Sequence, residues 1–278
     1  MLNRRKGVLV LAVFLFTFLF VTGGCDDGDY IKTIEKPIKS YTDIVTINDS
    51  LVIPYVYTSS VSLKNLPVAK KKQKFFDMML PAILVARKEL SFLLAKVDEI
   101  ALKDNPTPED LTFIKNLKKT YKVNSIELLK RRLHTSPVSI VLAQAAIESA
   151  WGTSRFFLEA NNPFGLWSFN SNEDRIQASS TRSGTKVYLK KFKNLEKAIE
   201  GYYKTLATGP YTDFRKERLK TKNPYILVKY LINYSERKEA YVQELASVIR
   251  GNDLTKYDNY RIDPKYINPN YINTKYIK

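Results

Sequence analysis

The chain has 278 residues, of which 44% are hydrophobic and 26% are charged. This composition suffices to bury a core and excludes wholesale disorder. One cysteine excludes an internal disulfide framework and a cysteine-rich zinc site, and the single histidine, His134, argues against a histidine metal centre or a Ser-His-Asp triad. The formal net charge of +17 favours polyanionic surroundings, such as nucleic acid, anionic lipid or an acidic wall polymer.

The N-terminus has the pattern of an export signal. Residues 4–6 are basic, an apolar run follows over residues 8–21, and small residues lead to Cys25. The run is too short for a typical membrane span. It resembles a bacterial lipoprotein signal, in which residues 1–24 are removed and Cys25 is lipidated. An uncleaved anchor, or an ordinary signal peptide with an incidental cysteine, remains an alternative. Export to the cell envelope makes nucleic acid an unexpected partner.

Residues 25–69 lack sustained periodicity and are predicted to form a tether with one or two short strands. From residue 70 apolar residues recur at helical spacing, and Pro81 should kink this helix or separate two helices. A second helix is predicted to start with Thr107 as N-cap and to continue to Tyr121, and another starts at residue 126.

The next predicted helix carries the candidate chemistry. Ser136 is expected as its N-cap with Pro137 in the first turn, and Gly152 as its stop. Glu148 lies at the end of a mostly apolar stripe on this helix. Desolvation there would raise the pKa of its carboxyl group, as a general acid requires. The alternative is a solvated surface glutamate or one that caps a loop.

Alternating residues over 187–192 predict a small β-hairpin, and residues 196–206 return to helix. Past residue 252 the chain becomes rich in tyrosine, lysine and asparagine. This tail, residues 253–278, is expected to be disordered, to wrap the domain as an extended segment, or to bind the cell wall.

Residues 143–169 closely resemble the catalytic core of family 73 of the glycoside hydrolases, which are endo-β-N-acetylglucosaminidases that cut peptidoglycan. The similarity extends over about 70–252 and is greatest to the bacterial Bax-type subgroup. It implies a predominantly α (α+β), lysozyme-like helical domain with a small β-hairpin lobe, in which Glu148 is the general acid. No metal or organic cofactor is implied.

The resemblance also implies a substrate cleft. Aromatic side chains would supply flat faces for pyranose rings, although each can instead belong to the core. Tyrosines of the helix after the hairpin would lie toward the site. The expected substrate-binding residues are Gln144, Trp151, Asn162, Phe164, Trp167 and Tyr203.

The second catalytic group is less clearly marked. Many relatives offer a glutamate on the β-lobe, but the strand over residues 184–192 contains no acid. Glu173 and Asp174, in the preceding loop, are the remaining candidates for a base. Alternatively, the N-acetyl oxygen of the substrate attacks the anomeric carbon, and Tyr202 positions the amide.

Two other functions fit the same fold. A lytic transglycosylase also uses a lone glutamate, and a catalytically inert wall-binding lipoprotein could retain the scaffold. The expected partners are peptidoglycan glycan strands and, through the N-terminal lipid, a membrane. The sequence leaves the oligomeric state open.

Overall fold

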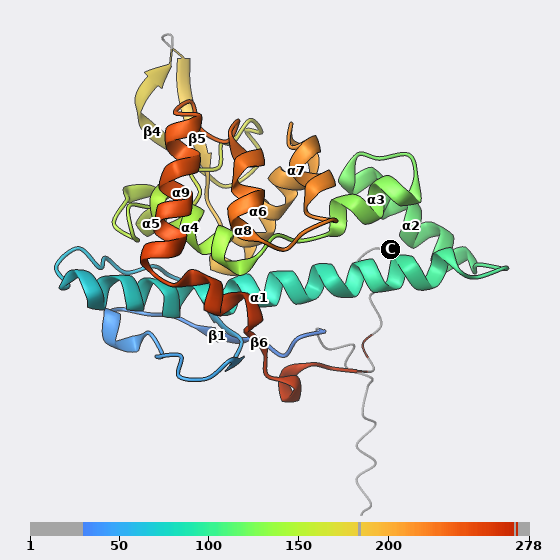
Figure 1. The fold of residues 1–278 in the computed structure, drawn as a ribbon, viewed down its shortest axis with the longest axis horizontal. Helices are drawn as coiled ribbons and strands as arrows, with labels where there is room; N and C mark the ends of the chain where they lie inside the picture. The colour runs from blue at the N-terminus through green and yellow to red at the C-terminus, as the bar shows by residue number, and fades with distance from the viewer. Residues whose placement is uncertain (1–29, 183–184, 270, 272–278) are drawn as a thin grey trace, which may run out of the picture.

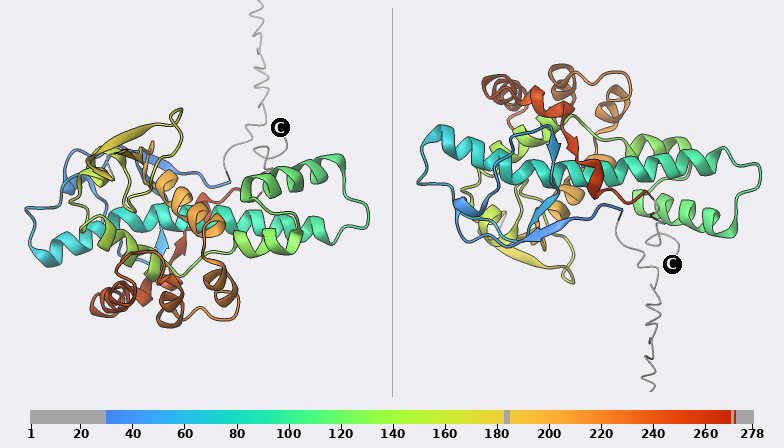
Figure 2. Two further views of the ribbon diagram at one scale, coloured as in Figure 1. Left: turned by 90° about the horizontal axis from the view of Figure 1, so that it is seen from above. Right: turned by 90° about the horizontal axis from the view of Figure 1, so that it is seen from below.

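The computed structural model describes residues 30–182, 185–269 and 271. One long helix, α1 (Val68–Ala101), runs through the middle of the molecule (Figure 1). Most of the other helices lie on one side of α1, and the N-terminal strands lie on the other (Figure 1, Figure 2). The expected fold class, predominantly α with a small β-hairpin lobe, is confirmed.

Pro81 does not divide α1 into two helices. Every residue from Phe75 to Ala86 is buried. This burial stabilises the helix by more than the missing N–H of one proline destabilises it.

The remaining helices are mostly short. Thr107 caps α2 as predicted, in a capping box in which the backbone N–H of Asp110 donates to the Thr107 hydroxyl and the Asp110 carboxylate accepts from the Thr107 N–H. Leu93, Phe113 and Leu129 form a separate small core between α1, α2 and α3. The helices of this part are α2 (Pro108–Tyr121), α3 (Ile126–Leu133), α4 (Val138–Glu148), α5 (Arg155–Ala160), α6 (Leu195–Thr208), α7 (Thr212–Glu217), α8 (Pro224–Leu227), the 3-10 helix η2 (Val228–Leu231) and α9 (Glu239–Gly251).

Helix α4 is the buried centre of the main core. It begins at Val138 with Pro137 at the N-cap, so the predicted side-chain cap by Ser136 was wrong. It ends at Glu148, earlier than the expected stop at Gly152. Residues 138–146 are all buried, and α4 packs against both α1 and α9. The first side chain that leaves the core is therefore near the C-terminal end of the helix.

The predicted hairpin is present as the antiparallel strands β4 (Arg175–Arg182) and β5 (Thr185–Lys190). It projects from the helical body (Figure 1), and β4 contacts α5. A bridge between Trp167 and Leu189 joins the hairpin to the loop that follows α5.

The expected tether is packed structure wherever it is described. Strands β1 (Ile34–Lys36) and β3 (Tyr55–Tyr57) pair in parallel, and the 3-10 helix η1 (Tyr41–Asp43) lies between them in sequence. Each short apolar run in this polar stretch buries one residue, Ile44 in the first and Val52 in the second, whereas Leu51 is exposed. Several of its residues belong to the main core: Ile31, Ile38, Ile44, Val52, Tyr57 and Leu63.

The described part of the C-terminal tail wraps the domain, one of the three expected arrangements. It contains η3 (Leu254–Asn259), β6 (Arg261–Ile262) and η4 (Pro264–Tyr266). Strand β6 pairs in parallel with the N-terminal strand β2 (Leu51–Val52). The two ends of the chain therefore complete the same core, which extends beyond both predicted boundaries at residues 69 and 252.

Among the described residues, no helix combines the length and apolarity needed to span a bilayer. The predicted signal segment and Cys25 lie outside the described residues.

Candidate active site

Glu148 is the last residue of α4, and its side chain is partly buried. Desolvation raises the pKa of its carboxyl group above the ordinary value, although Tyr241 and Arg237 act in the opposite direction. A raised pKa is the shift that general-acid catalysis requires, because it favours the protonated carboxyl group.

The backbone turns sharply after Glu148. Ala150, Trp151 and Gly152 all have positive φ angles, of 49°, 59° and 75°. The hydroxyl of Ser149 stabilises this turn, because it donates to the carbonyl of Ala145 and accepts from the N–H of Gly152. Three successive residues in the left-handed region are unusual, and such conformations persist where surrounding structure enforces them.

A chain of hydrogen bonds joins three buried side chains near Glu148. The hydroxyl of Tyr202 donates to Gln144 Oε1 at 2.6 Å, and Gln144 Nε2 donates to the hydroxyl of Tyr241 at 3.1 Å. The Tyr241 hydroxyl lies near the Glu148 carboxyl group, and their interaction lowers the pKa of Glu148 and raises that of Tyr241. Tyr202 and Gln144 are fully buried. This burial does not support the expected direct contacts of Tyr202 and Gln144 with a substrate, which stay a prediction.

Tyr241 is the residue that the sequence analysis did not assign to the site. It lies on α9, and its ring stacks on that of Tyr234 at 5.7 Å between centroids. Burial raises the pKa of Tyr241, and the nearby Glu148 charge raises it further. Its hydroxyl therefore stays protonated and can donate a hydrogen bond.

Arg237 and Glu244 bring further charge close to Glu148. They form an ion pair at 2.6 Å, with the Arg237 side chain about half exposed. The Arg237 charge lowers the pKa of Glu148, and the Glu244 charge raises it. Glu244 is thus a carboxylate near the candidate acid that sequence reasoning also missed. Its only signal in the sequence was its place within residues 70–252, which resemble the Bax-type subgroup.

Three of the expected substrate-binding residues instead hold the scaffold together. Asn162 is buried and bonds the carbonyls of Leu166 and Lys190. Phe164 is buried and stacks on Tyr202 at 4.3 Å. Trp151 is half-buried, and its ring packs edge-on against two phenylalanines of α1, Phe75 and Phe76.

Trp167 remains a candidate platform for a sugar ring. It is 41% exposed, and its ring lies 6.1 Å from that of Phe169, which is 87% exposed. Tyr203, by contrast, is buried, and its hydroxyl has no hydrogen-bond partner among the described residues. The expected role of Tyr203 in substrate binding does not fit this burial.

The two candidate bases lie in the loop before the hairpin. Glu173 forms an ion pair with Lys190 at 2.7 Å, and hydrogen bonds that include this one hold its pKa below the ordinary value. Asp174 is exposed, and its backbone carbonyl accepts from the N–H of Lys191. Neither carboxylate is among the groups whose charge shifts the pKa of Glu148.

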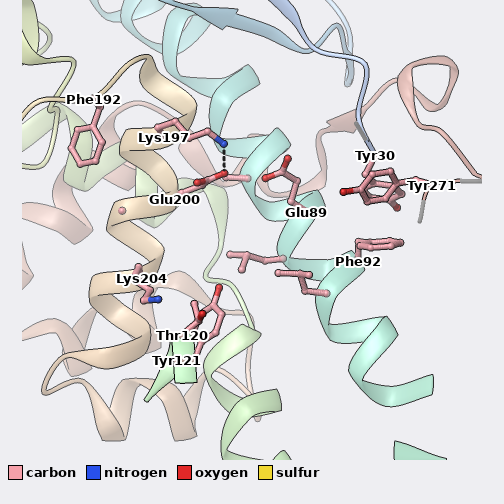
Figure 3. Close-up of a pocket in the computed structure, with 14 residues that line it drawn as sticks. Tyr30, Glu89, Phe92, Thr120, Tyr121, Phe192, Lys197, Glu200, Lys204 and Tyr271 are labelled. Atoms are coloured by element: carbon pink, nitrogen blue, oxygen red, sulfur yellow. Dashed lines mark hydrogen bonds and ion pairs between the residues drawn. The ribbon is translucent and has the colours of Figure 1, made fainter. Parts of the chain in front are cut away.

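A separate pocket of about 450 Å³ lies between α1 and α6 and does not include Glu148. In Figure 3, Glu89 reaches from α1 toward Lys197 and Glu200 on α6. Carboxylate oxygens of Glu89, Glu196 and Glu200 lie within 4.8 Å of one another, as a cation site requires. Lys197, however, pairs with Glu196 at 3.0 Å and with Glu200 at 2.7 Å, so its ammonium group already supplies positive charge to this cluster.

Comparison with known proteins identifies related sequences. Residues 123–254 match the Glucosaminidase family model, described as mannosyl-glycoprotein endo-beta-N-acetylglucosaminidase. Protein bax of Escherichia coli (strain K12) is 26% identical over 161 residues, which cover 52% of this chain and 57% of that protein. Exo-glucosaminidase LytG of Bacillus subtilis (strain 168) is 24% identical over 215 residues, which cover 69% of this chain and 70% of that protein.

Among solved structures, the catalytic domain of the autolysin Auto from Listeria monocytogenes is 24% identical. It covers 58% of this chain and 93% of its own, with a TM-score of 0.37. The matched region of the family model contains both Glu148 and Tyr241. The family model and the sequence relatives support the expected relationship to the glucosaminidases, carried by residues 123–254.

Proposed function

We propose that this protein is a peptidoglycan hydrolase that cleaves the β-1,4 glycosidic bond after N-acetylglucosamine, with Glu148 as the general acid. The observation that carries the proposal is the partly buried carboxyl group of Glu148, whose pKa is raised by desolvation at the end of α4. This carboxyl group lies in the region that matches the glucosaminidase family model.

In the proposed reaction, protonated Glu148 gives its proton to the glycosidic oxygen as the bond from that oxygen to the anomeric carbon breaks. The N-acetyl oxygen of the sugar that carries this anomeric carbon then attacks the carbon, which forms a new ring. Water attacks the same carbon, opens this ring and returns a proton to Glu148. Substrate assistance of this kind is a known exception to the two-carboxylate scheme. It suits this site because neither loop carboxylate, Glu173 or Asp174, shifts the pKa of Glu148.

The exposed Trp167 and Phe169 are proposed to bind a sugar ring beside the hairpin. Apolar sugar faces stack well on exposed aromatic rings, and a flat ring of this kind needs no rearrangement to accept one. We propose endo cleavage, within glycan strands. Cleavage from chain ends is the alternative, which the name of one relative, exo-glucosaminidase LytG, suggests.

Product analysis tests this function. Purified peptidoglycan is digested with the wild-type chain and with Glu148→Gln, and the products are identified by mass spectrometry. Reducing N-acetylglucosamine ends on large fragments are expected, whereas release of single sugars would indicate exo cleavage. Anhydro-muramyl ends would instead identify a lytic transglycosylase. If wild type and Glu148→Gln clear a peptidoglycan zymogram equally poorly, the inert wall-binding reading replaces the enzymatic one.

We also propose that Cys25 anchors the protein to a membrane of the cell envelope as a lipoprotein. Tyr30, the first described residue, packs against the main core, and the covalent link from Cys25 to Tyr30 can span no more than about 17 Å. An anchored enzyme would therefore work close to the membrane. Metabolic labelling with palmitate should mark wild type but not Cys25→Ala, and continued labelling of Cys25→Ala would defeat the anchor proposal.

A further inference from the structure

The pocket between α1 and α6 has the size and the lining of a small-molecule site. Its volume is about 450 Å³, and most of the residues around it are apolar or aromatic. The pocket does not include Glu148, so binding here can be tested apart from the proposed hydrolysis.

Three aromatic rings form one wall of this pocket (Figure 3). The ring centroid of Tyr30 lies 4.3 Å from that of Phe92 and 5.8 Å from that of Tyr271. The rings of Phe92 and Tyr271 are 5.4 Å apart. With Leu90 and Leu93 beside them, these rings offer an apolar surface on which the stem of a ligand can pack.

The charged end of the pocket has more carboxyl groups than ammonium groups. Carboxylate oxygens of Glu89, Glu196 and Glu200 lie within 4.8 Å of one another. Lys197 pairs with Glu196 and Glu200, but no lysine or arginine of the described residues forms an ion pair with Glu89. Three carboxyl groups therefore share one ammonium group, and this end of the pocket attracts a second positive charge.

An ammonium group fits this end better than a metal ion. Ca²⁺ takes about six to eight oxygen ligands, whereas an ammonium group needs only acceptors for its three hydrogens. The Lys197 ammonium also repels a divalent ion more strongly than it repels a single charge. Lys204 lies at the other end, with its Nζ 4.8 Å from the centroid of the Tyr121 ring. The positive charge of a ligand therefore belongs at the Glu89 end.

We propose that this pocket binds a primary amine with an apolar stem. The ammonium group pairs with Glu89 and Glu200, and the stem packs on the wall formed by Tyr30, Phe92 and Tyr271. The occupant has the charge that the carboxyl groups lack and the apolar body that the rings can cover.

Binding should be linked to the ionisation of Glu89. Burial, together with the charges of Glu196 and Glu200, raises the pKa of Glu89 to about 8, against the opposing effect of Lys197. An ammonium group pairs with the ionised form, so the apparent affinity should rise about fiftyfold from pH 6 to pH 8, as the ionised fraction rises.

Other titratable groups surround Glu89 and require a variant to assign this dependence. Burial also raises the pKa of Glu196. Besides the tyrosines of the pocket, the charged groups near Glu89 are Lys88 on α1 and Glu196, Lys197, Glu200 and Lys204 on α6.

The probe is phenethylamine, and 2-phenylethanol is its neutral control with the same stem. The full chain is labelled with carbon-13 at the glutamate carboxyl groups, and the Glu89 signal is assigned by its loss in Glu89→Gln. At pH 8 the chemical shifts should give a dissociation constant of about 1 mM or lower for phenethylamine. The alcohol should bind at least about tenfold more weakly, because it carries no charge.

Three variants locate the binding. Glu89→Gln should weaken phenethylamine at least about tenfold at pH 8 and remove the rise in affinity between pH 6 and pH 8. Glu200→Gln should weaken it in the same direction, as followed by the Glu89 signal. Glu99→Gln, on the same helix but outside the pocket, should bind like the wild type.

Equal binding of the amine and the alcohol would overturn the proposal, as would equal binding of the amine by wild type and Glu89→Gln. If Ca²⁺ shifts the Glu89 signal and phenethylamine does not, the cluster is a metal site and the proposal fails. If the amine binds as expected and the chain does not hydrolyse peptidoglycan, the amine site stands and only the proposed function fails.

Discussion

The Glu173 carboxylate and the Lys190 ammonium group lie 2.7 Å apart, in an ion pair between the loop and the last residue of β5. Paired in this way, Glu173 is a weak base, because the hydrogen bond from Lys190 stabilises its ionised form. The pairing ties the loop to the hairpin and does not connect it to α4.

We therefore expect unequal losses when the candidate carboxylates are replaced. Glu148→Gln should lower the hydrolysis rate at least about a hundredfold, the lower range of general-acid contributions. Glu173→Gln and Asp174→Asn should each lower it by less than about tenfold. Initial rates of dye release from labelled peptidoglycan provide the measurement. A loss in either loop variant that matched the loss in Glu148→Gln would establish a conventional inverting pair of carboxylates.

The turn after Glu148 makes a separate prediction about stability. A Cβ atom at Gly152 would lie 3.1 Å from Phe75 and 3.2 Å from Phe157, at a φ of +75°. Gly152→Ala should therefore lower the free energy of unfolding by about 1 to 3 kcal/mol. Gly251, the last residue of α9, has no atom within 4 Å of such a Cβ and is the matched control.

Gly251→Ala should be neutral or slightly stabilising, because alanine favours helix and restricts the unfolded chain. Urea unfolding of both variants gives the comparison. Equal free energies of unfolding in the two variants would mean that the left-handed turn does not require glycine at residue 152.

The parts of the site that could be predicted are those with local signals. The capping box at Thr107 and the hairpin can be read within a few residues, and Glu148 stands out within one helix. Tyr241 could not be placed in this way, because it joins Gln144 across 97 residues of sequence. Its contact depends on how α9 packs against α4, which no local pattern records.

The pairing between the two terminal segments escaped prediction for a related reason. Strands β2 and β6 contain only two residues each, so neither shows a period that can be recognised. Their pairing joins Val52 to Ile262 across 210 residues of sequence. Buried tyrosines such as Tyr202 show a further limit, since burial in the core and contact with a substrate produce the same sequence pattern.

The pairing of the two ends predicts that the tail supports the fold. Ile262 is 3% exposed, whereas its neighbour Arg261 points outward on the same strand. Ile262→Ala should lower the free energy of unfolding by about 2 to 5 kcal/mol, the usual range for a buried isoleucine. Arg261→Ala should change it by less than about 0.5 kcal/mol. Thermal and urea unfolding provide the measurement. An unchanged unfolding midpoint in Ile262→Ala would mean that the fold does not need the tail.

The pocket between α1 and α6 makes the stability depend on pH. Burial, together with the nearby charges of Glu196 and Glu200, raises the pKa of Glu89 from 4.5 to about 8, against the opposing effect of Lys197. Between these two pH values the folded chain keeps a proton that the unfolded chain has released. The folded state therefore binds more protons, and its stability falls as the pH rises from about 4.5 to about 8.

Glu89→Gln removes this dependence. Its melting temperature, relative to that of the wild type, should be higher at pH 9 than at pH 5, because glutamine has no proton to lose. Glu99→Gln, on the same helix, is the control. The hydrogen bond from Lys96 holds the pKa of Glu99 below its ordinary value, so this pKa shift is opposite in direction to that of Glu89. The pairing of Glu99 stabilises the folded chain at pH values above that ordinary pKa. The melting temperature of Glu99→Gln, relative to that of the wild type, should therefore not be higher at pH 9 than at pH 5. Melting curves of the three chains from pH 5 to pH 9 give the answer, and parallel curves for wild type and Glu89→Gln would show that Glu89 titrates normally.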